Sequence, residues 1–210
     1  MDHKEQSEEL RAWIRDENRE ALLERFQPLH PADAAEQLAM LPPAEVARFI
    51  ELLGTSESLD IFEFVPFDIQ KETLKFLSRN ILVELMSLMS PDDRADLVEE
   101  LDEKSQERLL SLLMQAERQN ILKLITYPEG SAGAYMTTDY AFLRADGSIR
   151  NALDQLRFQA LRKETIYYVY VVDQARRLTG FVSLRDLIMA HPEKDVAAVM
   201  HKNVISVRVD

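Results

Sequence analysis

Residues 165–190 read TIYYVYVVDQARRLTGFVSLRDLIMA and contain two β-forming runs followed by the start of a helix. The first run, TIYYVYVVD at 165–173, is rich in the β-branched and aromatic residues that favour strands. QARR at 174–177 predicts a turn, and LTGFVSL at 178–184 predicts the returning strand. The stretch therefore predicts an antiparallel hairpin that leads into a helix.

A strand and a helix are predicted before this hairpin. AFLRADGSI at 141–149 predicts a short strand with a turn, and SIRNALDQLRF at 148–158 predicts an amphipathic helix. The apolar positions of that helix are Ile149, Leu153, Leu156 and Phe158. The order β-α-β-β-α is typical of a compact α/β unit. Near the end of the chain, Val204–Val209 predicts the first strand of a second such unit.

The N-terminal part is helical and repetitive. Breaker or capping residues recur about every twelve positions, and the segments between them carry apolar residues at helical spacing. One such set is Val46, Phe49, Ile50 and Leu53. Proline fits the first turn of a helix but not its interior, so four prolines are expected to begin helices. They are Pro31, Pro43, Pro66 and Pro91.

Helices of about eight to ten residues are marginal alone in water and must stack on neighbours. The repeat therefore predicts a superhelical array of short antiparallel helices. We expect a longer helix at about residues 5–26 to open the array and another at about 102–126 to close it.

The excess negative charge lies in this helical part. Residues 1–126 contain 27 acidic and 14 basic side chains, a net charge of −13, whereas residues 127–210 contain 10 and 11, a net charge of +1. Phosphates would be repelled by such a surface, so nucleic acid is not expected as a partner. Cations or a basic protein are the natural complement.

Charge and composition together divide the chain into four parts. Residues 1–126 are predicted to form an acidic helical domain, and two glycines indicate a hinge at 127–134. Residues 135–195 predict the α/β domain, and residues 196–210 the truncated start of a second one. The predicted fold class is thus α plus α/β.

Several protein classes are disfavoured by composition. The chain has no cysteine, which excludes disulfides and thiolate metal sites. It has no apolar run of the roughly 18–20 residues that a spanning helix needs, so this part of the protein is expected to be soluble. It contains no G-x-S-x-G, H-E-x-x-H or P-loop motif, and we expect no enzyme. His30 precedes Pro31 and is assigned to turn chemistry.

SPDDRADLVEELDE at 90–103 concentrates carboxylates at the start of one predicted helix. Ser90 is a favoured N-cap, and Asp92 and Asp93 lie where the helix dipole favours anions. Asp96 is beyond the first turn, and its i, i+4 spacing from Asp92 places both on one face, where they repel by about 0.2–0.5 kcal/mol. Mg²⁺ prefers such oxygen ligands. Capping explains Asp93, whereas capping and cation binding both remain open for Asp92.

The domain at 135–195, with YYVYVVDQARRLTGFVSLRDL at 167–187, resembles a CBS domain, named for cystathionine β-synthase. YPEGSAGAYMTTDY at 127–140 and SLRDLI at 183–188, together with the acidic array, make the chain similar to the cytoplasmic region of MgtE-type magnesium transporters. The resemblance covers essentially the whole chain. In one departure, Arg176 stands where CBS hairpins often have glycine, so a positive φ there would add a small strain.

The resemblance implies two sets of site residues. Asp60, Asp92 and Asp96 would line the face of the helical domain that responds to Mg²⁺. Asp186 would accept the ribose hydroxyls of an adenine nucleotide such as ATP, and Tyr168 and Arg185 would help to form its pocket. Capping is the alternative for Ser183-x-x-Asp186, and ordinary strand packing is the alternative for Tyr168.

The resemblance also implies a function and partners. The chain would be the regulatory region of a magnesium channel at the cytoplasmic face of the inner membrane. Mg²⁺ would bridge acidic interfaces with a second CBS domain and thereby close the transmembrane pore; a homodimer is also expected. Two alternatives remain at this stage. One is a nucleotide-sensing CBS module fused to a helical interaction domain. The other is a scaffold, because the array loosely resembles flagellar motor switch domains.

Overall fold

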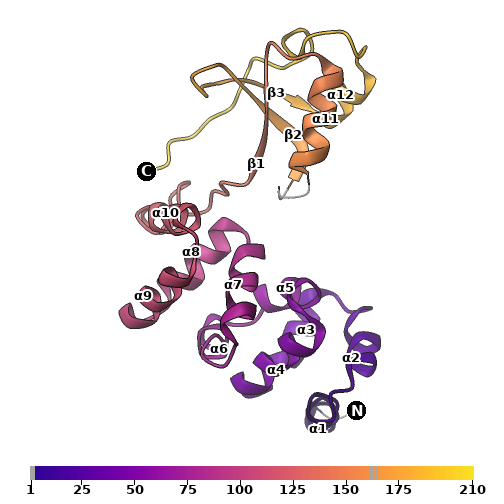
Figure 1. Ribbon diagram of the computed structural model, residues 1–210, viewed down its shortest axis with the longest axis vertical. Coiled ribbons are helices and arrows are strands. Elements are labelled where there is room, and N and C mark those ends of the chain that lie inside the picture. The colour runs from indigo at the N-terminus through magenta and orange to yellow at the C-terminus, as the bar shows by residue number, and fades with distance from the viewer. Residues whose placement is uncertain (1–2, 161–162, 164) are drawn as a thin grey trace. The chain divides into compact units, whose positions relative to one another are not determined.

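The computed structural model describes residues 3–160, 163 and 165–210, of which residues 3–6 are described by backbone alone. The chain divides into two compact units, residues 1–126 and residues 127–210 (Figure 1). In the described part of the chain, no helix combines the length and the apolar character that a membrane span requires.

The first unit consists of short helices in succession. They are α1 (His3–Arg15), α2 (Arg19–Phe26), α3 (Pro31–Leu38), α4 (Pro43–Leu53), α5 (Thr55–Glu63), α6 (Phe67–Thr73), α7 (Arg79–Leu88), α8 (Pro91–Glu99), α9 (Glu103–Leu112) and α10 (Gln115–Leu124). The predicted array of short helices is thus confirmed.

Prolines and side-chain caps set where these helices begin. Pro31, Pro43 and Pro91 are the first residues of α3, α4 and α8, and Pro66 is the N-cap of α6. His30 caps α3, since its Nδ1 accepts a hydrogen bond of 3.3 Å from the backbone N–H of Ala32. The predicted helix starts and the turn role of His30 are therefore confirmed.

The helical core uses the residues that the apolar spacing indicated. Val46, Phe49, Ile50 and Leu53 of α4 are all buried in one continuous core that extends from α1 to α10. The Phe49 ring meets that of Phe26 edge to face at 4.9 Å. Burial of each such side chain contributes about 1.5–3 kcal/mol. Stacking therefore stabilises helices that are individually too short to persist in water.

The two long helices expected at the ends of the array were predicted wrongly, because each is divided in two. Glu17 has φ 55° between α1 and α2, and Asn18 caps α2 by accepting from the N–H of Ala21 at 3.2 Å. Between α9 and α10, Leu113 is extended, and the N–H of Met114 donates to Glu117 Oε2 at 3.1 Å. Neither break contains proline or glycine, which explains why it was missed.

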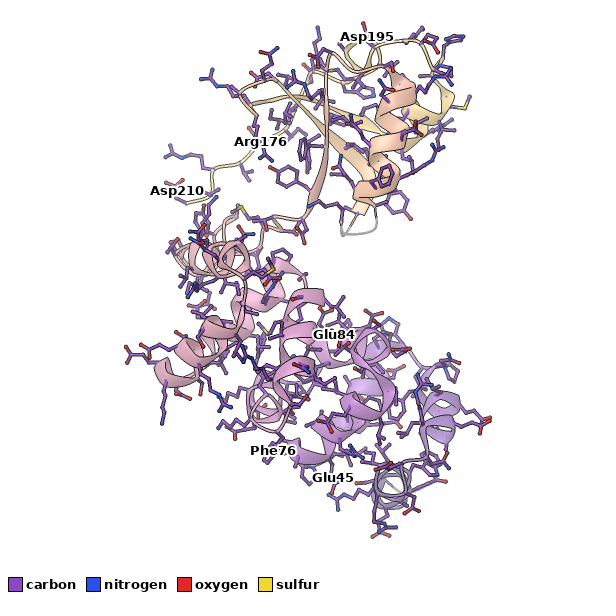
Figure 2. The ribbon with its side chains drawn as sticks, viewed as in Figure 1. Glu45, Phe76, Glu84, Arg176, Asp195 and Asp210 are labelled. Atoms are coloured by element: carbon purple, nitrogen blue, oxygen red, sulfur yellow. The ribbon has the colours of Figure 1, made fainter. Side chains whose placement is uncertain are left out.

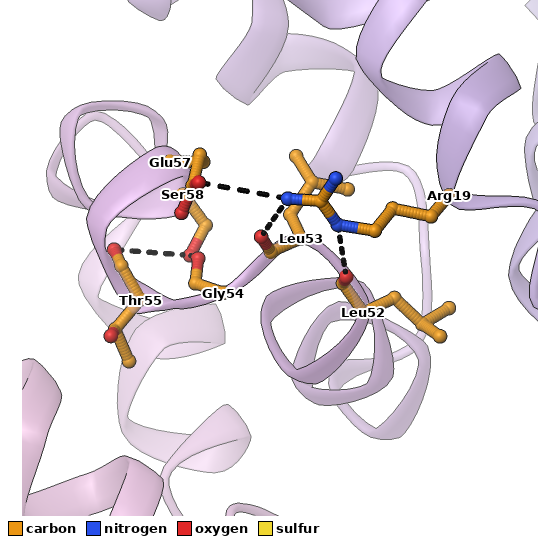
Figure 3. A network of polar contacts seen from close by, with 7 residues as sticks. All are labelled: Arg19, Leu52, Leu53, Gly54, Thr55, Glu57 and Ser58. Carbon is orange, nitrogen blue, oxygen red and sulfur yellow. Dashed lines mark hydrogen bonds and ion pairs between the residues drawn. The ribbon is translucent and has the colours of Figure 1, made fainter.

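Arg19 connects α2 to the junction of α4 and α5 (Figure 3). Its guanidinium donates to the carbonyl oxygens of Leu52 and Leu53, both at 3.2 Å, at the C-terminus of α4. It also pairs with Glu57 of α5 at 3.6 Å. Gly54, with φ 97°, lets the chain pass directly from α4 into α5. A cation at a helix C-terminus is favoured by the helix dipole.

The second unit has the predicted β-α-β-β-α order. Its elements are β1 (Tyr140–Arg144), α11 (Ile149–Gln159), β2 (Thr165–Val172), β3 (Leu178–Ser183), α12 (Leu184–Met189) and the short 3₁₀ helix η1 (Val196–Ala198). In the described residues the strands form one sheet in the order β1-β2-β3, with β1 parallel and β3 antiparallel to β2.

Side chains alternate between the two faces of the sheet along each strand, so one face is buried and the other is more exposed. Leu143, Val169 and Val171 are buried in a core with Ile149 and Leu156 of α11, and this core is separate from the helical one. The intervening strand positions carry more exposed tyrosines, such as Tyr168 and Tyr170.

Phe158 does not follow the apolar face predicted for α11. Its side chain is 78% exposed, whereas Leu156, two residues earlier, is buried. Successive helical residues differ by about 100°, so a residue two positions from a buried one points well away from the core.

The hairpin turn confirms the expectation for Arg176, which has φ 60°. Asp173 Oδ1 closes the turn by accepting from the N–H groups of Ala175 and Arg177, each at 2.8 Å. The guanidinium of Arg176, which is labelled in Figure 2, lies 5.0 Å from the centre of the Phe142 ring, and this cation–π contact offsets part of the backbone strain.

Val204–Val209 forms no strand in the structure, contrary to our prediction. A strand requires a partner for its backbone hydrogen bonds, and this segment extends with Ile205 96% exposed. The chain nevertheless returns to the sheet just before it. Phe181 and His201 exchange two backbone hydrogen bonds, of 2.9 and 2.8 Å.

Residues 125–139 contain turns but no helix or strand. Gly130 has φ 78° and open space around it, as a flexible link would. Gly133 differs, because a Cβ there would collide with the Tyr127 ring and lie 2.7 Å from the Val209 carbonyl oxygen. Close packing therefore explains Gly133, and the hinge at 127–134 stays a prediction.

Candidate functional site

The first candidate site is an acidic face built from α5 and α8 of the helical unit. Asp60 and Glu63 are three residues apart on α5, and Asp92 and Asp96 are four residues apart on α8, so each pair shares one side of its helix. Asp93, in the first turn of α8, is the fifth carboxylate. We refer to these five residues as the acidic face.

Capping accounts for one of the five carboxylates. Ser90 Oγ accepts from the N–H of Asp93 at 3.2 Å and donates to Asp93 Oδ2 at 2.7 Å. The capping interpretation of Asp93 is therefore confirmed. Asp92 has no comparable partner: its Oδ1 is buried and accepts no hydrogen bond from the described residues.

Burial and electrostatic repulsion raise two pKa values within the acidic face. Burial raises the pKa of Glu63 from 4.5 to about 7, and the negative charges of Asp93, Asp60 and Asp92 add to the rise, against a hydrogen bond from the backbone of Ser90 that lowers it.

The pKa of Asp96 is raised as well, first by burial and then by Asp93, Asp92 and Glu99. Carboxylates of α5 and α8 thus oppose the ionisation of Glu63, and carboxylates of α8 oppose the ionisation of Asp96. A cation near them would relieve that repulsion.

The acidic face is incomplete as a metal site by itself. In the described ranges, no three acidic or histidine side chains converge as they would around a metal ion. Asp60 and Asp92 both raise the pKa of Glu63, and Asp92 raises the pKa of Asp96. Further oxygen ligands for a metal ion would have to come from water or from another part of the protein.

The second candidate site is a cavity of about 1010 Å³ in the CBS-like unit, open to solvent on one side. Tyr168 of β2 and Arg185 and Asp186 of α12 all line it. The other lining residues are Tyr167, Phe181, Ser183, Leu184, Ile188, Met189 and His201. The structure therefore brings together all three residues predicted for a nucleotide.

The two carboxylate oxygens of Asp186 can serve two functions, one in capping a helix and one in binding a ligand. Its Oδ2 accepts from Ser183 Oγ at 2.6 Å and lies 3.1 Å from His201 Nε2, and the N–H of Asp186 donates to Ser183 Oγ at 3.1 Å. This confirms a capping box at the start of α12. The hydrogen bonds from Ser183 and His201 lower the pKa of Asp186, so the carboxylate is charged at neutral pH. Among the described residues these side-chain contacts use Oδ2, which leaves Oδ1 for a ligand.

Aromatic rings form one wall of this cavity. The His201 ring stacks on Phe181, with centroids 5.1 Å apart and planes at 24°, and Tyr168 meets Phe181 edge to face at 6.0 Å. Planar rings of this kind suit a nucleobase, and the nearby Arg185 suits a phosphate.

Sequence reasoning missed several residues of the two sites, of which Glu63, Phe181 and His201 have the most specific contacts. Glu63 had a usable signal, its position three residues after Asp60 on the same helix. Phe181 lies within the predicted return strand but had no feature that separated it from a packing residue. His201 has no local signal, because only the tertiary fold brings it beside Asp186.

Comparison with known proteins agrees with this architecture. The family model described as MgtE intracellular N domain matches residues 29–130, and the CBS domain model matches residues 132–193. The structure superposes on "the soluble part of a magnesium transporter" with a TM-score of 0.83 and 31% identity, over 99% of this chain and 82% of that one. The chain belongs to the MgtE family.

Two matches that are named MgtE extend the comparison. The cytosolic domain of the Mg²⁺ channel MgtE in complex with ATP matches with a TM-score of 0.86 and 33% identity, over 97% of this chain and 84% of that one. The magnesium transporter MgtE of Enterococcus faecalis is 45% identical over 87 residues, 41% of this chain. That stretch is 19% of the length of the relative, so this chain spans only part of an MgtE transporter.

Proposed function

We propose that this chain is the cytosolic magnesium-sensing region of a magnesium channel or transporter. The observation that supports the proposal most directly is the acidic face, where burial and neighbouring carboxylates raise the pKa values of Glu63 and Asp96. Membership of the MgtE family makes magnesium the cation of interest. Two relatives, each matched over 19% of its own length, are named magnesium transporter MgtE.

The proposed mechanism is electrostatic. At low Mg²⁺ concentration, the net charge of −13 on residues 1–126 repels acidic neighbours, and the helical unit moves about the hinge at 127–134. At high concentration, Mg²⁺ bridges Asp60, Asp92 and Asp96 to carboxylates of the second CBS domain, and the pore closes. The cation shifts this equilibrium only because it binds the closed state more tightly.

Asp92 has the most to gain from a cation, because one of its carboxylate oxygens is buried and unpaired. Its Oδ1 lacks a hydrogen bond from the described residues, and a buried acceptor without a partner costs about 1–3 kcal/mol. Mg²⁺ or one of its bound waters would satisfy that oxygen. Protons compete for the same face, since Glu63 is partly protonated at neutral pH.

Limited proteolysis at residues 127–134 tests the proposal, with and without millimolar Mg²⁺, on the full-length protein. We expect Mg²⁺ to protect the segment and an Asp92→Asn/Asp96→Asn variant to lose that protection. The matched control is Glu8→Gln/Glu9→Gln, which removes two exposed charges from α1. Cleavage that is equally independent of Mg²⁺ in all three proteins would reject these residues as the sensor.

We further propose that the cavity of the CBS unit binds an adenine nucleotide. Asp186 would accept the ribose hydroxyls, Arg185 would face the phosphates, and Tyr168 would flank the base. The cavity has sufficient volume, and an MgtE relative is known as a complex with ATP.

Calorimetric titration with ATP tests this second proposal. Asp186→Asn is expected to weaken binding at least about tenfold, because a hydrogen bond from a ribose hydroxyl to a charged carboxylate is stronger than one to an amide. Asp154→Asn, on the exposed side of α11, is the matched control. Equal affinities of the two variants would show that Asp186 is only a cap.

A further inference from the structure

His201 lines the cavity of the CBS-like unit beside Asp186, although it comes from a separate segment near the end of the chain. Its backbone pairs with that of Phe181 in β3 through two hydrogen bonds, of 2.9 and 2.8 Å. Gly180 permits this approach, because a Cβ at that position would lie 2.6 Å from the His201 carbonyl oxygen. The main chain of His201 is therefore fixed against the sheet.

The segment that precedes His201 is fixed as well. The N–H of Val196 donates to the carbonyl oxygen of Gly147 at 2.9 Å, and the N–H of Ala197 donates to that of Ala145 at 3.0 Å. Val196 is also fully buried in the core of this unit. His201 thus reaches the cavity on a backbone that is anchored at Val196 and again at His201 itself.

The contacts of the His201 ring favour one orientation. One face of the ring stacks on Phe181 with the centroids 5.1 Å apart, and Nε2 lies 3.1 Å from Asp186 Oδ2. An ionised carboxylate only accepts hydrogen bonds, so Nε2 carries the hydrogen atom of this contact. The His201 side chain is 56% exposed, so burial in a core does not explain its position.

Asp186 needs a second donor if one of its oxygens is to stay directed at a ligand. The terminal torsion of an aspartate side chain is broad and two-fold, so the carboxylate rotates readily. Ser183 restrains Oδ2 from within the same capping box, with its Oγ at 2.6 Å. His201 restrains the same oxygen from a separate segment. Two donors from different parts of the chain fix the carboxylate plane better than one.

We infer that His201 is a positioning residue for the ribose of a bound nucleotide. It holds Oδ2 of Asp186 so that Oδ1 faces the ribose hydroxyls, and it thereby makes the site select ribonucleotides over deoxyribonucleotides. The inference rests on the proposed nucleotide site and adds one residue and one specificity to it. A ligand without the ribose hydroxyl gains nothing from an oriented Oδ1, so the contribution of His201 lies in the difference between the two ligands.

Isothermal titration calorimetry of this chain with ATP, 2′-deoxyATP and 3′-deoxyATP tests the inference. The unsubstituted chain should bind ATP at least about tenfold more tightly than one of the two deoxynucleotides, because a hydrogen bond to a charged carboxylate is lost. His201→Phe keeps a ring that can stack on Phe181 but removes the donor, and it should reduce this affinity ratio to about threefold or less. His201→Gln retains an N–H donor and should keep the ratio above that of His201→Phe.

The affinity ratio separates positioning from a loss of folding. A variant that is only partly folded loses apparent affinity for all three nucleotides by the same factor, so the ratio does not change. Circular dichroism measures the folded fraction. The matched control is His191→Phe, which removes an exposed imidazole outside the cavity lining and should leave the ratio within about twofold.

Two results would overturn the inference alone. One is a full ratio in His201→Phe, and the other is an equal loss of the ratio in His201→Gln and His201→Phe, which would show that the ring matters and the donor does not. In both cases the unsubstituted chain still binds ATP, and the proposed nucleotide site stands. If the unsubstituted chain does not bind ATP, or binds it no more tightly than either deoxynucleotide, the role proposed for Asp186 is rejected together with that of His201.

Discussion

Replacement of Glu63 by glutamine offers a direct measure of repulsion within the acidic face. Glu63 has a pKa of about 7 in the folded protein, against an ordinary value of 4.5. A raised carboxylate pKa means that ionisation opposes folding. The contribution of protonated Glu63 to the stability of the folded protein is fully present below pH 4.5, and it is lost as the pH rises through 7.

The pKa values set the size of the effect. A rise from 4.5 to about 7 corresponds to about 3.4 kcal/mol at full ionisation. Solvent screens this half-buried carboxylate, so we expect about 1–2 kcal/mol. Glutamine has no charge to repel Asp60, Asp92 or Asp93, and its carbonyl oxygen can still accept the hydrogen bond from Ser90. Glu63→Gln should therefore be more stable than the unsubstituted chain at pH 8.5 and nearly equal at pH 5.

Urea unfolding followed by tryptophan fluorescence measures this difference. Trp13 is the single tryptophan of the chain and packs against the helical core, so its emission reports on the helical unit alone. The control is Glu9→Gln on α1. Parallel pH–stability curves for Glu63→Gln and the unsubstituted chain would refute the reasoning, because they would show that Glu63 is not a repelled, desolvated carboxylate. Millimolar Mg²⁺ should reduce the difference at pH 8.5 if cations screen this face.

Three further substitutions test individual contacts. Arg19→Ala should destabilise the helical unit by about 1 kcal/mol in the same assay, since two carbonyl oxygens at the end of α4 lose a half-exposed charged donor. Gly180→Ala would place a Cβ 2.6 Å from the carbonyl oxygen of His201, so it should displace His201 from Asp186 and weaken ATP binding in calorimetry; unchanged affinity would show that His201 does not shape the cavity. At position 176, which has φ 60°, Arg176→Gly should be more stable than Arg176→Ala by about 1 kcal/mol in thermal unfolding, because glycine alone adopts this backbone conformation without strain.

Local sequence patterns predicted the architecture well where the pattern lies within a single helix or hairpin. The hairpin of β2 and β3 and the short helices that begin at proline follow from strand-forming runs, apolar spacing and fixed proline φ angles. The breaks at Glu17 and Leu113 were missed, because polar caps and packing of the flanking helices produce them without glycine or proline. Val204–Val209 was misassigned for a related reason: β propensity indicates a strand, but only a neighbouring strand can complete its hydrogen bonds.

The sequence by itself determined the chemistry available to this protein: an excess of negative charge in residues 1–126, a strand-rich CBS-like part, and a cap at Ser183-x-x-Asp186. These features depend on residue type and short spacing, which folding does not alter. The tertiary structure decided which groups share an environment. It placed Glu63 of α5 among the carboxylates of α8, and His201 against Phe181 and Asp186. Burial and proximity between distant segments set the pKa values and the cavities, and neither quantity exists until the chain is folded.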